Sequence, residues 1–157
     1  MRLIGIFMVV ILGWNAPSLS PAQQPKEPAQ RYGIDADLEN YPQNDAKAAL
    51  ASVHKAIDEK KIDYLLAQLC DPQWVDSRVK KVHGGKFEEC VKETTDRLAI
   101  EPGIVEELRK FLREGTWGGD ETEARVSLKD SDHQVSLHKI ENRWYLKNEN
   151  KSKDKGK

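Results

Sequence analysis

The sequence predicts an α+β domain in which three to four N-terminal helices pack on a C-terminal antiparallel sheet of at least three strands. Two patterns carry this prediction. Apolar residues recur at helical spacing between residues 46 and 112, and apolar and polar residues alternate between residues 124 and 147. Helices that precede the strands along the chain are typical of α+β folds and not of alternating βαβ units.

Two helices open the predicted domain. Apolar residues at three- and four-residue spacing predict the first helix, and Asn44, a favoured N-cap residue type, comes just before it. Asp63 can cap a second, shorter helix, which Asp71-Pro72 should stop since proline disrupts a helix interior. The segment 73–81 fits either a short strand or an anchor that packs on the core.

Two further helices are predicted before the sheet. The turn at residues 83–85 leads into a third helix, with one apolar face running from Phe87 to Leu98. Pro102 suits the first turn of a fourth helix, which Gly115 ends.

Two turns set the expected register of the sheet. A two-residue turn at 141–142 places Leu137 opposite Leu146. A turn at 131–132, or a four-residue loop over 130–133, places Val126 opposite Leu137. Both turns bring the apolar residues to one face, which comprises Ala124, Val126, Leu128, Val135, Leu137, Trp144 and Leu146.

The segments outside this domain predict export. Residues 1–22 form an expected signal peptide, with Arg2 before the apolar run Leu3 to Gly13 and a small-residue cleavage pattern at 20–22. The apolar run is too short to span a bilayer comfortably, so we expect no stable membrane span after cleavage and a periplasmic or secreted protein. An uncleaved membrane anchor is the alternative.

Three ranges follow the expected signal peptide. Residues 23–43, rich in Pro, Gln and Ala, are interpreted as a flexible linker. Residues 44–148 form the single α+β domain, and the Lys-rich residues 149–157 are expected to be a disordered tail. The net charge of −1 gives no reason to expect nucleic acid as a partner.

Two stretches carry a family pattern. The first stretch is the helix, linker and helix from 46 to 72, where the pattern comprises Leu50, Ile57, Asp63, Leu65, Leu69, Asp71 and Pro72. The second is the terminal hairpin, where it comprises Val135, Leu137, Lys139, Glu141, Asn142, Arg143, Trp144 and Leu146. In these stretches, about half of the mature chain, the sequence resembles small exported members of the nuclear transport factor 2-like superfamily.

That resemblance implies a cone of helices wrapped against a curved sheet. Asn142 stands where these members usually have Gly, and helical signal fills residues 86–114, where larger members place strands. The resemblance does not imply one activity, because members range from isomerases and dehydratases to binding and assembly domains.

Catalytic groups are expected on the helices if anywhere. The predicted inner sheet face is aliphatic or Trp apart from Lys139, so no catalytic set is predicted there. His54 or Tyr64 could serve an isomerase- or dehydratase-like enzyme, and the candidate lining of a ligand pocket is His54, Tyr64, Trp74 and Trp144. No motif indicates a cofactor or a metal site.

The outer sheet face is a candidate partner surface. The predicted register places Arg125, His138 and Tyr145 in one row across the strands, and Ile140 shares their face. A solvated sheet face would show the same pattern, but aromatic and Arg side chains also make good anchors for a partner or a homodimer.

Cys70 and Cys90 are candidates for a disulfide, since an even cysteine count in an exported chain favours one. Two buried thiols are the alternative.

Three functions fit these observations. The preferred prediction is an exported non-catalytic domain that binds a partner protein or a small apolar ligand. The alternatives are an isomerase- or dehydratase-like enzyme and a structural or dimerisation module.

Overall fold

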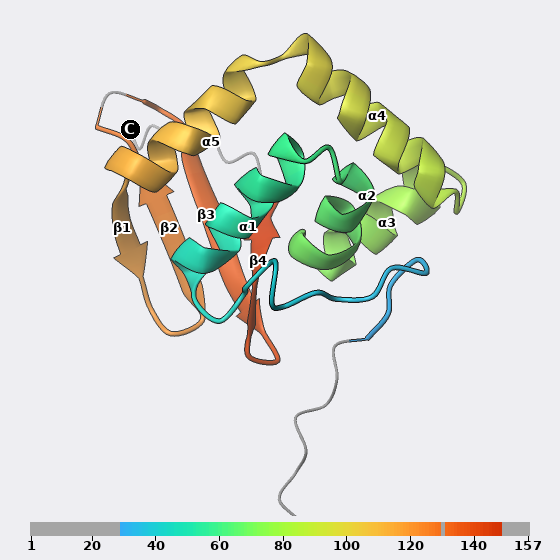
Figure 1. Ribbon diagram of the computed structural model, residues 1–157, viewed down its shortest axis with the longest axis horizontal. Coiled ribbons are helices and arrows are strands. Elements are labelled where there is room, and N and C mark those ends of the chain that lie inside the picture. The colour runs from blue at the N-terminus through green and yellow to red at the C-terminus, as the bar shows by residue number, and fades with distance from the viewer. Residues whose placement is uncertain (1–28, 130, 149–157) are drawn as a thin grey trace, which may run out of the picture.

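The computed structural model describes residues 29–129 and 131–148, and it confirms the α+β fold (Figure 1). The expected signal peptide 1–22 and the expected tail 149–157 lie outside the described residues. Within the described residues, the helices come first and a four-stranded antiparallel sheet follows. The helices are α1 (Ala46–Asp58), α2 (Ile62–Tyr64), the π-helical turn η1 (Leu65–Leu69), α3 (Pro72–Val82), α4 (Phe87–Ile100) and α5 (Gly103–Glu114).

The helix caps explain where α1 and α3 begin. Asp45, one residue after the predicted cap, accepts a hydrogen bond from the backbone N of Ala48 at 2.8 Å. Asp71 accepts from the backbone N of Gln73 at 2.8 Å, and Pro72 occupies the first turn of α3. Asp71-Pro72 therefore ends one helical stretch as predicted, but it also starts another in a segment interpreted as a strand or an anchor.

The sheet is an antiparallel meander in the order β1-β2-β3-β4. Its strands are β1 (Thr116–Gly119), β2 (Glu123–Ser127), β3 (Gln134–Ile140) and β4 (Arg143–Lys147). The sequence pattern did not predict β1 as a strand. β1 turns into β2 at Gly119, whose φ of 132° and close approach to the Glu123 carbonyl oxygen leave no room for a Cβ atom.

The register of the last hairpin matches the prediction, and that of the middle hairpin differs by two residues. Leu137 lies opposite Leu146, across a turn in which Glu141 and Asn142 both have positive φ. Val126 lies opposite Val135 and not opposite the predicted Leu137. A shift of two residues keeps every side chain on its face, so the alternation that predicted the faces could not distinguish the two registers.

Two packed clusters form the core. One joins the inner sheet face to α1 and α5, which cover that face in Figure 1, and contains Ala49, Leu50, Phe111, Ala124, Val126, Leu137 and Trp144. The other lies among α1, α2, η1, α3 and α4 and includes Tyr41, Val53, Leu66, Leu69, Val75 and Cys90. Hence α1 contributes to both clusters, with Leu50 in the first and Val53 in the second.

The described part of the expected linker 23–43 is packed on the domain, which corrects that prediction. Tyr41 is 1% exposed and Gln43 is 2% exposed. Arg31 donates to the Ala67 carbonyl at 2.9 Å and pairs with Asp76 at 2.6 Å. The buried residues of this segment are irregularly spaced, so they produce neither a helical nor a strand period. The prediction of a linker therefore rested on composition alone. No described helix is long and apolar enough to cross a membrane.

Candidate functional site

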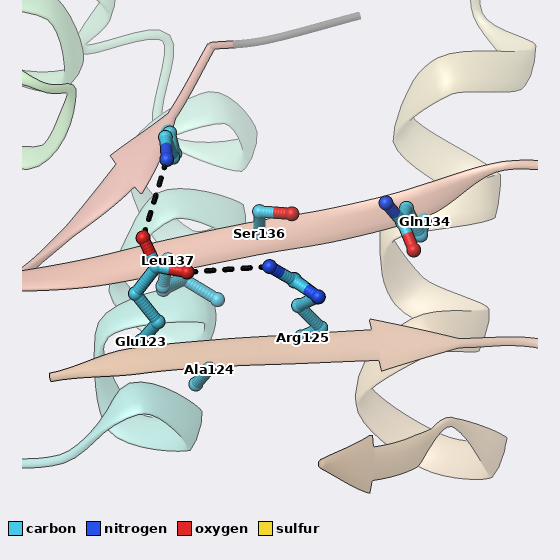
Figure 2. Close-up of a pocket in the computed structure, with 7 residues that line it drawn as sticks. Glu123, Ala124, Arg125, Gln134, Ser136 and Leu137 are labelled. Carbon is cyan, nitrogen blue, oxygen red and sulfur yellow. Dashed lines mark hydrogen bonds and ion pairs between the residues drawn. The ribbon is translucent and has the colours of Figure 1, made fainter. Parts of the chain in front are cut away.

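A groove on the outer face of the sheet is the best-formed candidate site (Figure 2). It encloses about 210 Å³ between β2, β3 and β4, and the helices lie behind the sheet in this view. Its lining comprises Glu123, Ala124, Arg125, Gln134, Ser136, Leu137 and Lys147. Ala124 and Leu137 belong to the core cluster, so the side chains presented to solvent by the groove are polar.

Charges of both signs meet in this groove. The Glu123 carboxylate lies 3.2 Å from Arg125 Nη2 and 3.4 Å from Lys147 Nζ. Glu123 and Arg125 are two residues apart on β2 and therefore share a face, and the dashed lines of Figure 2 converge on Glu123. The Arg125 side chain is 62% exposed, so water screens this pair and leaves its charge available to a contact.

Strand pairing places a row of polar side chains across the floor of the groove. Arg125 lies opposite Ser136, and Ser136 lies opposite Lys147. The row presents two cations and one hydroxyl, with the Glu123 carboxylate beside it. This arrangement can bind backbone amides and charged side chains of an extended peptide.

The predicted row of Arg125, His138 and Tyr145 is wrong at its first member. Glu123 lies opposite His138, because the β2–β3 register differs by two residues from the expected one. His138 does lie opposite Tyr145, as predicted. Arg125 thus belongs to the groove and not to the His138 row.

The predicted partner surface is also partly covered. Tyr145 is only 7% exposed, and burial raises the pKa of its phenol above the usual value. His138 Nε2 lies 3.4 Å from Asp71 Oδ2, and Ile140 is half-buried. Asp71 also donates its backbone N–H to the Leu146 carbonyl at 2.9 Å, so the start of α3 lies along the edge of β4. Arg125, His138, Ile140 and Tyr145 are therefore not exposed together.

The four residues predicted to line a ligand pocket are dispersed. Tyr64 is buried in the helical cluster, Trp74 packs against that cluster, and Trp144 belongs to the sheet cluster. The Tyr64 hydroxyl accepts from the backbone N of Asp37 at 2.9 Å, and burial raises the pKa of this phenol. These contacts give Tyr64 a structural role in holding the segment before α1.

His54 pairs within its own helix. Its Nδ1 lies 3.2 Å from Asp58 Oδ2, one turn along α1. Its Nε2 is buried without a hydrogen-bond partner in the described part of the chain. Neither of the two best-formed surface hollows includes His54 in its lining.

Cys70 and Cys90 are both free thiols in the structure, so the predicted disulfide is not formed there. Both are buried in the helical cluster. Burial raises the pKa of Cys70 to about 12 and also raises that of Cys90. The structure thus matches the alternative of two buried thiols.

A second surface hollow was missed by sequence reasoning. Arg143 lines this hollow, which lies where the segment before α1 meets the β3–β4 turn. Gln43, the residue that supports Arg143, lies in the expected linker, so only its tertiary contacts reveal it. The sequence does contain a signal for the groove. Polar and apolar residues alternate along 123–127, which places Glu123 and Arg125 on the same face.

The described residues hold no cluster of three or more His, Cys, Asp or Glu side chains arranged to bind a metal. Comparisons of the chain with protein-family models, curated proteins and solved structures find no match. The resemblance to the nuclear transport factor 2-like superfamily stays a prediction.

Proposed function

We propose that this protein is an exported, non-catalytic domain that binds a partner protein through the outer face of its sheet. The observation that carries the proposal is the groove in which Glu123, Arg125 and Lys147 meet around Ser136. Paired charges on a solvent-facing surface steer and orient a partner of complementary charge.

The packing of the inner sheet face supports a role without catalysis. The buried residues of this face are apolar, α1 and α5 pack against them, and Lys139, the polar residue opposite Trp144, is exposed. A general acid or base has to lie within reach of a bound substrate. The Nε2 of His54, the catalytic candidate on α1, is buried, and His54 lines neither of the two surface hollows.

The export part of the proposal rests on the sequence of residues 1–22. A positive residue, a short apolar run and a small-residue pattern are typical of a cleaved signal peptide. Mass spectrometry of the protein recovered from its producing cells should give the mass of a chain that starts at Gln23. A chain that keeps residues 1–22 would contradict export by cleavage.

Site-specific photo-crosslinking tests the binding surface. A photoreactive amino acid replaces Ser136 in the groove or, as the control, Lys110 on the exposed side of α5. Each protein is incubated with the exported protein fraction of the producing cells. We expect a discrete crosslinked adduct from position 136 that excess wild-type protein abolishes and that position 110 does not give.

Two competitor variants make this test specific to the groove. Arg125→Glu reverses one groove charge, whereas Arg113→Glu reverses a charge of similar exposure on α5. We expect Arg113→Glu to compete as well as the wild type and Arg125→Glu to compete poorly. Equal competition by both folded variants would show that the partner does not contact this groove.

A further inference from the structure

Arg143 differs from the other arginines that the structure describes. Each of the others forms an ion pair with an Asp or Glu side chain. Arg143 forms none within the described residues, although it is held firmly by other contacts. An arginine held in place and left without a carboxylate is a candidate binding group for an anion.

Neutral oxygen atoms hold the Arg143 guanidinium. Gln43 Oε1 accepts from Arg143 Nη2 at 2.5 Å and from Nε at 3.1 Å. Gln68 adds its side-chain and backbone oxygens at 3.2 and 3.3 Å from Nη2. The guanidinium carbon also lies 5.2 Å from the centre of the Tyr145 ring. These contacts orient the group, but amide oxygens do not neutralise its formal charge.

The Nη1 nitrogen of Arg143 is the donor that could bind an anion. The hydrogen bonds within the described chain use Nε and Nη2, and none of them uses Nη1. Gln43 and Gln68 are 2% and 0% exposed, so packing fixes the two side chains that fix the guanidinium. Little side-chain entropy would therefore be lost when Arg143 binds an anion.

Arg143 borders a surface hollow of about 310 Å³. Its lining combines the Arg143 guanidinium with two apolar residues and three amides: Leu38, Pro42, Gln43, Asn44 and Asn142. Leu38 is 41% exposed, and it is one of three exposed large aliphatic side chains in the described residues, with Val82 and Ile100. A cation beside an exposed apolar wall suits a ligand with an anionic end and an apolar end.

Four carboxylates neighbour lining residues of the hollow in the sequence, and none forms an ion pair with Arg143 within the described residues. Asp37 and Glu39 flank Leu38, and the Asp37 carboxylate accepts from Asn40. Asp45 caps α1 through the backbone N of Ala48 at 2.8 Å. Glu141 lies in the β3–β4 turn, next to the hollow residue Asn142. Because none of these carboxylates is paired with Arg143 in the described residues, the cation keeps its capacity for an added carboxylate.

We propose that this hollow binds a carboxylate that carries a short apolar group. The carboxylate accepts hydrogen bonds from Arg143, and the apolar group packs on Leu38 and Pro42. A free carboxylic acid and the C-terminal residue of a peptide share this chemistry. The site shares no lining residue with the sheet groove, so it is independent of the proposed partner surface.

Titrations followed by amide NMR test the proposal on the folded domain. The probes are N-acetyl-leucine, which has the carboxylate, and N-acetyl-leucinamide, which lacks it. We expect N-acetyl-leucine to shift the signals of Gln43, Asn44, Asn142 and Arg143 Nε saturably, and the amide to shift them far less. Equal shifts from both probes, or shifts spread over the whole domain, would overturn the proposal.

Substitutions at Leu38 change the charge of the site without removing Arg143. Leu38 is exposed, so both Leu38→Glu and Leu38→Lys should fold, which equal melting temperatures would verify. A unit charge several ångströms away in water changes affinity by about threefold. We expect weaker N-acetyl-leucine binding for Leu38→Glu and tighter binding for Leu38→Lys, both relative to Leu38→Gln. Identical affinities for the two charged variants would place the carboxylate elsewhere.

A third probe identifies the source of the carboxylate. N-acetyl-Ala-Ala-Leu presents the same terminal carboxylate on a peptide. Tighter binding of the peptide than of N-acetyl-leucine would support a C-terminal peptide as the ligand. Equal or weaker binding would support a free carboxylic acid.

Discussion

The side chain of Gln43 accepts two hydrogen bonds from Arg143, a residue 100 positions later in the chain. The same Gln43 amide donates to the Trp144 carbonyl at 2.8 Å and to the Gln68 carbonyl at 3.1 Å. One glutamine thus connects the segment before α1 to η1 and to the last strand. This connection closes the domain and also orients the guanidinium of the proposed carboxylate site.

Replacing Gln43 with Ala should destabilise the domain. The substitution removes the buried side-chain donor of the Trp144 carbonyl and one of the two side-chain donors of the Gln68 carbonyl, and it weakens the support of Arg143. We expect a loss of about 2–3 kcal/mol in the free energy of unfolding, because buried polar groups lose their partners. Urea denaturation measures it. Gln73→Ala, at an exposed position of α3, is the control and should change stability by less than about 0.5 kcal/mol.

The packing of residues 29–43 predicts an effect of Arg31→Ala. Arg31 contacts the Ala67 and Pro72 carbonyls and the Asp76 carboxylate, and its side chain is 20% exposed. We expect a loss of about 1–2 kcal/mol and faster proteolysis of this segment. Arg113→Ala, which breaks a more exposed ion pair, should change neither. Unaltered stability and proteolysis in Arg31→Ala would restore the linker interpretation.

The β3–β4 turn predicts a stabilising substitution. Glu141 has a φ of 46° and Asn142 a φ of 69°. Left-handed backbone is unfavourable for Glu and better tolerated by Asn. We expect Glu141→Asn to raise the free energy of unfolding by about 0.5–1 kcal/mol. Glu121→Asn, at a position outside left-handed backbone, should give no such gain in the same thermal or urea melts.

The two thiols should be unreactive in the folded protein. Burial raises the pKa of Cys70 to about 12 and that of Cys90 above its usual value, so little thiolate exists at pH 8. We expect a thiol reagent to label neither cysteine in the native state and both in urea. Labelling of neither cysteine in urea without reductant would reveal a disulfide, which mass spectrometry would show as the loss of two hydrogens.

The ionised carboxylate of Asp120 should contribute to the stability of the β1–β2 turn, and acid should remove this contribution. Asp120 Oδ1 accepts from the backbone N of Thr122 at 2.7 Å and of Glu123 at 2.9 Å, and these bonds lower the pKa of Asp120. A lowered folded-state pKa contributes stability above the unfolded-state pKa, near 4, and this stability disappears as the pH falls through the folded-state pKa.

Asp120→Asn tests this contribution. The variant should be less stable than the wild type at pH 7, and the difference should shrink as the pH falls below about 4. Urea midpoints measured across this range provide the comparison. Glu121→Gln, at the neighbouring position, is the control. A constant difference between Asp120→Asn and the wild type would exclude ionisation as its cause.

The element types were predictable where local signals agreed. The period of three and four residues identified α1, and Pro102 and Gly115 bounded the helix that became α5. The segment 73–81 was ambiguous, because Pro72 both stops one helix and suits the first turn of another. β1 was missed, since four residues with two glycines carry no alternation.

The candidate sites were less predictable than the fold. Arg125 was identified as exposed on the outer sheet face, but a two-residue register shift gave it Ser136 as its neighbour in place of His138. Tyr145 was placed on the outer face correctly and yet is buried. The alternation of side chains reports which face a residue takes and not what covers that face.

By itself, the sequence determined the α+β order, the two faces of the sheet and the turn at Glu141-Asn142, because each follows from periodicity or from backbone preference within a few residues. Only the tertiary structure decided the strand register of β2 on β3, the packing of residues 29–43 and the position of Arg143, which pairs with no carboxylate of the described residues. These depend on contacts between distant residues, such as Gln43 with Arg143, whose free energy local sequence patterns do not encode.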